Sequence, residues 1–417
     1  MRVPLVQGAY SARSIIASAQ RSVNIYGEMN PAGTTLDLQG LASGGLMGAA
    51  VAKGSPAAPI TYYPCPGLKL LGTPGSSDDF TSDFTSDFGG VKTIGGGARC
   101  LYRATNGDVY YVVGGTVYFV SPSFAFTPLG SIIPASTPCS MSDNGTTAVL
   151  VDGSPQGYQI DLTTKTFSQI SAATNSPPST SVYGFFGADR CDMLDGFMVL
   201  NQPGTRNFYS TLENEIAFDA TFFAAKNAFS DKLASVIVTK RQIWLVGERT
   251  TEIWLDSGAQ GFPFEIVPGP FIQHGTNAKY SVAQIDGAVY FLSQDQAGQN
   301  IMIRGSGYEA QRVSNHAVET EWSNYATTDD AVGFCFQQNG HPFYQINFPT
   351  ADRSWRYDES TQEWHEPVYT DADGVEHRHR AQCVASVNGQ ILAGDWETGA
   401  LYALDTNTYT DNGMPMV

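Results

Sequence analysis

Four short stretches of the chain combine residue types that could do chemistry. Residues 371–376 read Asp-Ala-Asp-Gly-Val-Glu, and their carboxylates could supply oxygen ligands to a calcium ion. Residues 377–380 read His-Arg-His-Arg, which on a strand would place both imidazoles on one face and both guanidiniums on the other, as in a pH-sensitive or anion-contacting strip. Residues 305–310 spell a dinucleotide-binding loop, and residues 293–298 are similar to the Asp-box turn of propeller sialidases.

Each of these stretches has a simpler structural interpretation. An EF-type calcium loop needs a third ligand and a distal Glu, so we expect residues 371–376 to form an Asp-Gly turn. We expect residues 377–380 to form a solvated edge strand, and residues 305–310 a hairpin turn because no helical pattern follows the glycines. The Asp-box-like stretch occurs once and lacks the closing Thr-Trp pair. Since P-loop, nucleophile-elbow and zinc-protease motifs are also missing from the sequence, we predict no enzyme activity, no cofactor and no metal site.

The composition indicates a large all-β protein. Of the 417 residues, 42% are hydrophobic and 12% are aromatic, which is enough to bury a sizeable core. Only 15% are charged, and the 43 Gly and 22 Pro predict neutral polar faces and many turns. With 40 Asp+Glu against 23 Lys+Arg, the net charge of −17 argues against coating of DNA, because neutralising phosphates needs an excess of cations. A channel through which DNA slides without sticking stays compatible with this charge.

Cysteine usage favours folding in a reducing cytoplasm. The six cysteines are scattered without a Cys-x-x-Cys pair, so we expect free, buried thiols rather than disulfides or a zinc site. The first residues carry no apolar core with a small-residue cleavage site, so we expect no signal peptide. No stretch reaches the roughly 20 apolar residues of a spanning helix, so we expect no membrane segment.

One theme repeats from about Gly97 onward: two short strands of aromatic and β-branched residues joined by a turn. Residues 108–113 and 116–120 flank Gly114 and Gly115, which is a hairpin signal. Comparable apolar runs begin at residues 147, 196, 242, 288, 334 and 390.

A sharper marker recurs on the second hairpin of the repeat. Asp161 and Asp358 are each followed by Thr three residues later and by an aromatic residue six later, and Asp405 begins a shortened version. Asp and Thr side chains at this spacing suit hydrogen bonds to the backbone of a turn. The two full copies lie 197 residues apart, or four periods of about 49.

A period of this length with about four short strands per unit predicts an all-β, β-propeller-like fold with six or seven blades. We assign the propeller to residues 97–417 and an N-terminal arm to residues 1–96. A β-sandwich is the alternative fold. We expect residues 211–229 to form a helical interruption, and the Ser/Asp/Phe tract at residues 78–88 has no assigned role.

Three segments carry a resemblance to a known family. Residues 19–28 read Ala-Gln-Arg-Ser-Val-Asn-Ile-Tyr-Gly-Glu, which looks like a segment near the start of the packaged-DNA stabilisation proteins of short-tailed bacteriophages (podoviruses). Residues 241–254, with Phe-Pro-Phe at 262–264, resemble the central hairpin of that family. Residues 313–319 are similar to its Ile-Ser-x-x-Ala-Val-Glu stretch.

The resemblance implies a structural virion protein: a tail hub, or nozzle, subunit that extends the portal–adaptor channel, retains packaged DNA and conducts it during ejection. It implies a ring of copies, a hexamer in the family, made in the bacterial host cytoplasm and resident in the phage tail. Its partners would be the portal–adaptor (head-to-tail connector) proteins, a needle, fibre or tailspike, and duplex DNA that passes without sequence-specific binding. Residues 1–96 would also be the tail-ring docking region, with Gln20, Arg21, Asn24 and Tyr26 at the interface.

A carbohydrate-binding or sialidase-like β-propeller, acting as an adhesin or glycosidase, is the main alternative. Exposed aromatic residues and acidic loops would serve such a protein equally well. A cellular scaffold propeller is a third hypothesis.

Overall fold

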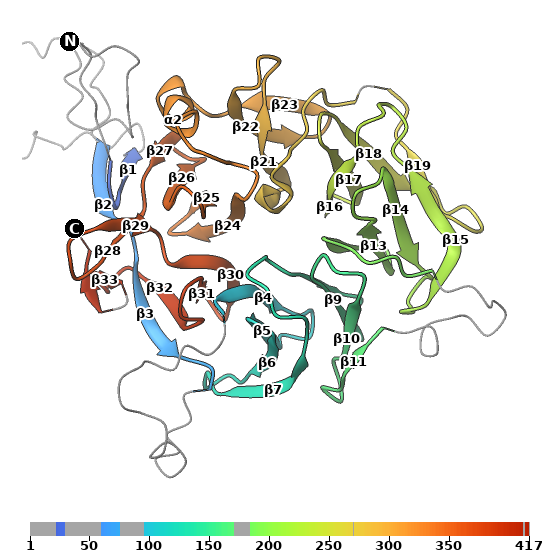
Figure 1. Cartoon of the computed structure of the whole chain (residues 1–417), viewed down its shortest axis with the longest axis horizontal. Helices are drawn as coiled ribbons and strands as arrows, with labels where there is room; N and C mark the ends of the chain where they lie inside the picture. The colour runs from blue at the N-terminus through green and yellow to red at the C-terminus, as the bar shows by residue number, and fades with distance from the viewer. Residues whose placement is uncertain are drawn as a thin grey trace, which may run out of the picture.

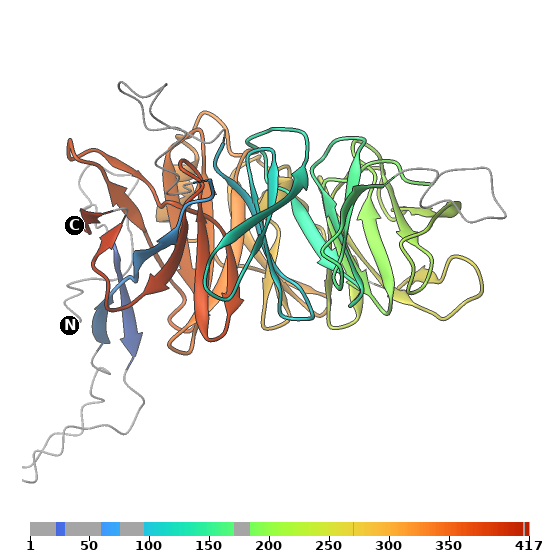
Figure 2. The ribbon, with the colours of Figure 1, turned by 90° about the horizontal axis from the view of Figure 1, so that it is seen from below.

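The computed structural model describes residues 22–29, 60–75, 96–170, 184–269, 271–411 and 413–416. These residues form seven four-stranded antiparallel sheets that stand around a common axis as the blades of a β-propeller (Figure 1). Seen edge-on, the blades stand side by side in one layer (Figure 2). The predicted all-β propeller of six or seven blades is confirmed with seven blades, and the sandwich alternative is wrong.

Six blades use four strands that follow one another along the chain, with the first strand nearest the axis. Blade 1 holds β4 (Ala98–Arg103), β5 (Val109–Val113), β6 (Thr116–Val120) and β7 (Phe126–Ser131); blade 2 holds β8 (Ser140–Asp143), β9 (Thr147–Val151), β10 (Gly157–Asp161) and β11 (Phe167–Gln169). Blade 3 holds β12 (Cys191–Leu194), β13 (Phe197–Asn201), β14 (Asn207–Thr211) and β15 (Phe218–Ala225); blade 4 holds β16 (Leu233–Thr239), β17 (Gln242–Gly247), β18 (Thr251–Asp256) and β19 (Phe264–Ile266). Blade 5 holds β20 (Ala283–Ile285), β21 (Ala288–Gln294), β22 (Asn300–Ser306) and β23 (Glu309–Arg312); blade 6 holds β24 (Val332–Gln338), β25 (His341–Phe348), β26 (Arg353–Asp358) and β27 (Glu363–His365).

Blade 7 combines a strand that precedes blade 1 with three strands that follow blade 6. Its inner strands are β30 (Ala381–Val387), β31 (Gln390–Asp395) and β32 (Leu401–Asp405), whereas its outer strand is β3 (Gly67–Gly72). Figure 1 shows β3 beside β32, and the two strands pair antiparallel with Gly67 opposite Asp405. The shortened marker at Asp405 therefore ends a third strand whose outer neighbour comes from the beginning of the propeller. The division of the chain at residue 96 stays a prediction, and β3 is a propeller strand that precedes it.

Three two-stranded sheets accompany blades 6 and 7. They pair β1 (Ile25–Met29) with β2 (Ile60–Pro64), β28 (Val368–Thr370) with β29 (Glu376–Arg378), and β33 (Thr410–Asp411) with β34 (Met414–Pro415).

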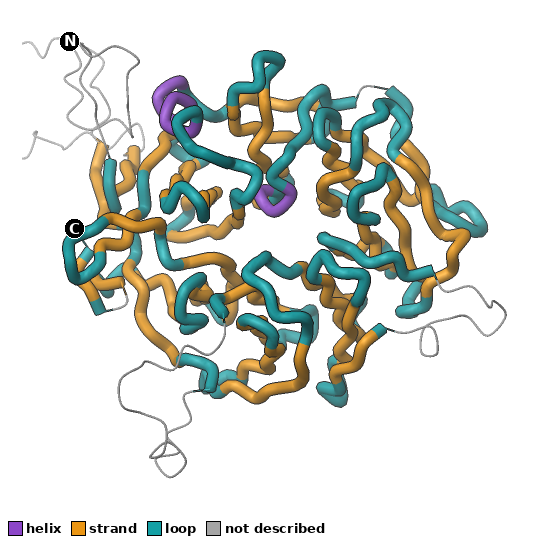
Figure 3. The backbone as a smooth tube through the Cα atoms, in the orientation of Figure 1, coloured by secondary structure: helices purple, strands orange, loops and turns teal. Residues whose placement is uncertain are grey.

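The described helices are α2 (His316–Trp322) and the short 3-10 helix η2 (Lys279–Ser281) (Figure 3). Asn315 caps α2 by accepting from the backbone N–H of Val318 at 3.0 Å. The helix expected at residues 211–229 is wrong, because β15 occupies much of that range and pairs with β14 as the outer strand of blade 3. Sheet pairing outweighs the helix propensity of its alanines. Neither described helix is long and apolar enough to cross a membrane.

The repeated Asp marker forms the same turn in two blades. Asp161 ends the third strand of blade 2, and Asp358 ends the third strand of blade 6, so the expected separation of four blades is confirmed. Asp161 Oδ1 accepts from the backbone N–H of Thr164 at 2.7 Å, and Asp358 Oδ1 accepts from the residue two positions on at 2.8 Å. The fifth residue of each turn, Lys165 and Gln362, has a left-handed φ of 60° and 59°. The carboxylate thus holds the tight reversal that starts the outer strand.

Two tryptophans, Trp244 and Trp254, lie in the core of blade 4. Trp244 on β17 and Trp254 on β18 are 1% and 7% exposed, and they point to opposite faces of blade 4. Trp254 packs among residues of blade 3, whereas Trp244 packs among residues of blade 5. A Cβ added at Gly305 would lie 2.6 Å from Trp244 Cζ3, so blade 5 keeps a glycine where the indole meets its backbone.

We expect Trp244→Ala to lower the free energy of unfolding by about 3–5 kcal/mol, because it empties the contact between blades 4 and 5. Chemical denaturation followed by circular dichroism measures the loss. Phe229→Ala is the matched control, since Phe229 is 47% exposed. Equal stability of both variants would contradict the assignment of Trp244 to the core.

The hydrogen bond between Leu68 of β3 and the buried Asp411 predicts that the stability of the folded protein depends on pH. Leu68 N–H on β3 donates to Asp411 Oδ1 at 3.0 Å, and burial raises the pKa of the Asp411 carboxyl to about 7, against the lowering influence of Arg356 and Arg380. The Asp411 carboxyl therefore keeps its proton in the folded protein up to about pH 7, whereas it releases the proton near pH 4 in the unfolded chain. The stabilisation that comes from this bound proton is fully present below pH 4 and is lost as the pH rises to about 7. We expect Asp411→Asn, which keeps the acceptor, to stabilise the protein more at pH 8 than at pH 5 in denaturation curves. A gain independent of pH would contradict the buried, protonated carboxyl.

Candidate functional site

The arm enters the described structure at Ser22 and is bonded to the end of blade 6. Glu366 N–H donates to Ser22 O at 2.9 Å, and Asn24 N–H donates to Glu366 O at 2.9 Å. The Asn24 side chain donates through Nδ2 to Val368 O at 3.1 Å and accepts from Val368 N–H through Oδ1 at 2.8 Å. Asn24 is 5% exposed and has a left-handed φ of 52°, a conformation that Asn tolerates better than most residues. One amide thus satisfies both polar groups of a residue 344 positions away.

Tyr26 anchors the arm two residues later. It is 6% exposed, and its ring centroid lies 5.4 Å from that of His341 and 5.5 Å from that of Phe343, both on β25. The ring of Tyr63 on β2 packs beside the ring of Tyr26, with the two centroids 5.9 Å apart. The aromatic ring therefore joins the arm to the core between blades 6 and 7.

A buried cation lies beneath this anchor. Arg356 on β26 is 1% exposed, and its Nε and Nη2 donate to Gln345 Oε1 at 3.0 and 2.7 Å. Its guanidinium lies 5.1 Å from the ring centroid of Phe336. Burial, with the Arg356 charge added, holds the pKa of His365 well below its usual value, so the imidazole beside Tyr26 is neutral. The contacts of the arm in this region are thus apolar and aromatic.

The four residues predicted for the interface fall into two groups. Asn24 and Tyr26 are buried in the protein's own fold, whereas Gln20 and Arg21 lie outside the described residues. Their interface role stays a prediction. Sequence reasoning missed the partners of the arm, including Val368, because they lie more than 300 positions away and no local pattern marks them.

The prediction of a solvated edge strand for residues 377–380 is wrong in its solvation: residues 377 and 378 belong to β29, which pairs only with β28, but most of the run is buried. His379 and Arg380 are 2% and 1% exposed. The run leads directly into β30, the innermost strand of blade 7, where neighbouring blades cover it. Position in the propeller, and not the polarity of the run, decides its burial.

Two side chains of this run, Arg380 and His377, have carboxylate partners within the fold. Arg380 Nε donates to Asp395 Oδ2 at 2.9 Å. His377 lies between two carboxylates, with Nδ1 2.7 Å from Asp352 Oδ2 and Nε2 3.2 Å from Asp371 Oδ2. The hydrogen bond to Asp352 and then that to Asp371 raise the pKa of His377. His377 and Arg380 are therefore parts of a structural network of charges.

The other stretches with possible chemistry are turns. Asp371 Oδ1 accepts from the backbone N–H groups of Asp373 and Val375 at 3.0 and 2.8 Å, which confirms the Asp-Gly turn. Residues 305–310 include the predicted hairpin turn between β22 and β23, and residues 293–298 join β21 to β22. Within the described ranges, no group of three or more His, Cys, Asp and Glu side chains is placed to hold a metal ion. The six cysteines are free, and four of them are buried.

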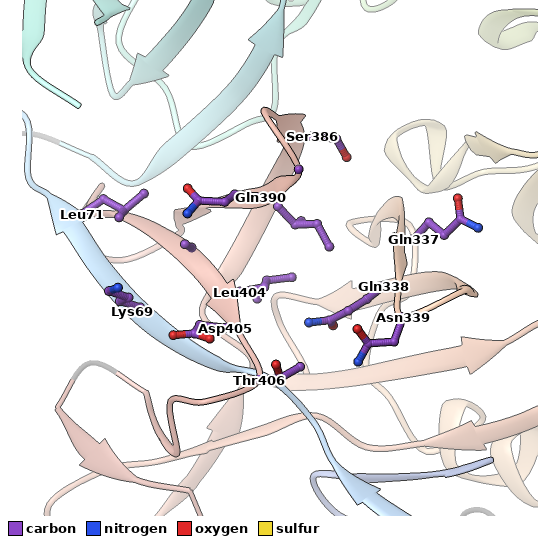
Figure 4. A pocket seen from close by; sticks show the side chains of 13 residues that line it. Lys69, Leu71, Gln337, Gln338, Asn339, Ser386, Gln390, Leu404, Asp405 and Thr406 are labelled. Atoms are coloured by element: carbon purple, nitrogen blue, oxygen red, sulfur yellow. The ribbon is translucent and has the colours of Figure 1, made fainter. Parts of the chain in front are cut away.

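A polar groove of about 510 Å³ lies at the junction of blades 6 and 7 (Figure 4). Lys69 on β3 and Asp405 on β32 lie along one side, and Gln338 and Asn339 of the β24–β25 hairpin lie on the other. Leu404 contributes to its apolar part. Amides over an apolar base suit hydrogen bonding to the backbone of an extended peptide. The groove crosses the strand that closes the propeller.

The chain is similar to known proteins in sequence and in fold. A protein-family model described as bacteriophage P22 Gp10, beta-propeller, matches residues 80–409. No curated protein matches the chain in sequence.

Several solved structures are similar to the chain. The WD40 β-propeller domain of Doa1 is 10% identical, with a TM-score of 0.44 over 81% of this chain and 97% of that chain. The computationally designed Ika8 protein is 9% identical, with a TM-score of 0.41 over 76% and 98%. YCF48 bound to D1 peptide is 10% identical, with a TM-score of 0.42 over 75% and 92%.

We expect Asn24→Ala to lower the free energy of unfolding by about 1–3 kcal/mol, because it leaves the N–H and C=O of Val368 buried without the amide. Denaturation curves measure the loss. Gln390→Ala, at an exposed position in the groove of Figure 4, is the control for loss of an amide. Unchanged stability of the Asn24 variant would show that the arm is not held by these bonds.

Proposed function

The chain belongs to the phage stabilisation family described as bacteriophage P22 Gp10, beta-propeller, a family of structural proteins of the phage virion, and on that premise we propose that it is a tail hub, or nozzle, subunit. In this role it extends the portal–adaptor channel, retains packaged DNA and conducts it during ejection. The observation that carries the proposal is the family match over residues 80–409, which spans six complete blades and the three inner strands of blade 7.

The closed propeller supports a role as a building block of a ring. Leu70 on β3 is 58% exposed, and Phe223 on β15 is 50% exposed. Figure 1 shows these two outer strands on opposite sides of the disc. Two different rims of one rigid body, each with an exposed apolar residue on its outer strand, suit head-to-tail contact between copies, which closes into a ring when the rotation allows it. The number of copies, six, is taken from the family resemblance.

The charge distribution supports passage of DNA without capture. The net charge of −17 disfavours tight phosphate contact. Arg378 and Arg380, in the most basic run of the sequence, are 9% and 1% exposed, so they are not available to a passing duplex. A net-negative wall lets a polyanion slide, because it makes no attractive phosphate contacts that would hold it.

The arm supports docking at one end of the ring. We assign Asn24 and Tyr26 to anchoring the arm on blade 6, and the preceding Gln20 and Arg21 to contact with the portal–adaptor proteins. The polar groove of Figure 4 lies at the junction of blades 6 and 7, and blade 6 is the blade that anchors the arm; the groove suits an extended segment of another tail protein, such as a needle, fibre or tailspike.

We expect particles made without this protein to package DNA and then lose it, and the wild-type chain added to such particles to restore retention. Phe223→Asp should fail to restore it, because a charge on the apolar rim opposes contact between copies. Tyr308→Asp is the matched control, since Tyr308 is 43% exposed on another blade. Protection of packaged DNA from nuclease is the measurement.

Two results would overturn the proposal. One is retention of the genome by particles that lack the protein. The other is binding of duplex DNA by the isolated chain at submicromolar affinity with a steep dependence on salt, since a tight electrostatic contact would hold DNA that must move.

A further inference from the structure

The β28–β29 hairpin lies in the chain between blades 6 and 7 and is the part of the propeller to which the arm is bonded. Its two strands pair with Val368 opposite Arg378 and Tyr369 opposite His377. The N–H and C=O of Val368 bond the side chain of Asn24, so β28 is bonded to the arm as well as to β29. Contacts that hold β29 in place therefore also hold the strand that carries the arm.

His377 joins β29 to blade 6. Its Nδ1 lies 2.7 Å from Oδ2 of Asp352, in the turn between β25 and β26, and its Nε2 lies 3.2 Å from Oδ2 of Asp371, in the turn of the hairpin itself. An ionised carboxylate only accepts hydrogen bonds, and a neutral imidazole has a single N–H. A neutral ring would therefore turn a lone pair toward one of the two carboxylates. Both contacts are hydrogen bonds only when the ring is protonated.

Backbone hydrogen bonds hold both carboxylates in position. Oδ1 of Asp352 accepts from the N–H of Arg378 at 3.1 Å, and Oδ1 of Asp371 accepts from two N–H groups of its own turn at 3.0 and 2.8 Å. The bond from the N–H of Val375, and then that from His377, lower the pKa of Asp371, so this carboxyl is ionised at neutral pH. Each carboxylate thus turns its Oδ2 toward the imidazole.

Other groups pack around His377 from the neighbouring elements. Arg353, at the start of β26, donates through Nη1 to the backbone oxygens of Asp352 and Glu376 at 3.0 and 3.1 Å. The ring of Tyr369 on β28 lies with its centroid 6.1 Å from that of the imidazole. The charged groups of the two turns and of the residues that contact or flank them are the carboxylates of Asp330, Asp352, Asp371, Asp373 and Glu376 and the guanidiniums of Arg353, Arg378 and Arg380. Carboxylates outnumber guanidiniums in this set, which favours the charged imidazole.

We propose that His377 is a pH-dependent latch: the protonated ring ties the β28–β29 hairpin, and through it the arm, to blade 6, and loss of the proton weakens the attachment of both. The hydrogen bond to Asp352, opposed by partial burial and aided by the bond to Asp371, raises the pKa of His377 above its ordinary value of about 6.5. The stabilisation that comes from this bound proton is fully present below a pH of about 6.5 and is lost as the pH rises through the pKa of the folded protein. The proposal does not rest on the ring of copies or on DNA retention.

Hydrogen exchange of the full chain, followed by mass spectrometry, measures this coupling. Residues 22–26 of the arm and 366–378 around the hairpin are each compared with 242–247 of β17, at pH 6 and pH 8.5, after correction for the chemical effect of pH on exchange. We expect the protection of the arm and hairpin segments relative to β17 to be about two- to fivefold greater at pH 6, the ratio that a partly exposed ion pair gives.

Matched variants assign the difference to one ring. His377→Gln should remove most of it, whereas His316→Gln should leave it unchanged, because the His316 side chain is 83% exposed on α2. The titration of Asp411 is common to the wild type and both variants, so the comparison isolates His377.

NMR of isotope-labelled histidine reads the proton itself. The His377 ring should titrate above the ordinary histidine value, and Asp352→Asn and Asp371→Asn, which each keep an acceptor oxygen, should each lower the midpoint. If one of these variants fails to fold, the other still decides. The proposal is overturned if the His377 ring is neutral at pH 6, if His377→Gln keeps the pH dependence of exchange seen in the wild type, or if residues 366–378 respond to pH and the arm does not.

Discussion

The antiparallel pairing of β3 with β32 is the contact on which the architecture depends. Each of the other six blades completes its own sheet from consecutive strands, but blade 7 lacks an outer strand until residues from before blade 1 supply it. Hydrogen bonds from Gly67 to Thr408 O and from Leu68 to Asp411 then cover the outer side of the same strand. Closure of the circle converts a row of sheets, each with two exposed faces, into a body in which each blade is packed on two neighbours.

The pairing of β3 with β32 also fixes the geometry of the arm and of the groove at the junction of blades 6 and 7. Asn24 reaches Val368 only because blade 6 and blade 7 are held side by side, and the groove of Figure 4 includes β3 itself. Sites of this kind occur where several rigid elements converge, so a few polar groups can be aimed with little loss of side-chain entropy on binding.

Features that depend on residues close together in the chain were predictable from the sequence. Features that depend on contacts between distant residues were not. The Asp161 and Asp358 turns, the Gly114 hairpin and the burial of Trp244 follow from residues close together in the chain, whose spacing encodes a period. The place of β3, the burial of Arg380 and the partners of Asn24 depend on residues more than 300 positions apart or on which strand lies nearest the axis. A short polar run such as His377–Arg380 looks solvated until the position of its strand is known.

The shared seventh blade also sets an order of events during biosynthesis. β3 leaves the ribosome more than 300 residues before its partner β32. Throughout most of synthesis, β3 lacks its sheet neighbour and blade 1 lacks one of the blades it packs against, so the nascent chain has no closed rim. Only a chain translated through β32 can present both rims in their final geometry. A chain that ends before β32 therefore cannot take part in any assembly that contacts both rims at once.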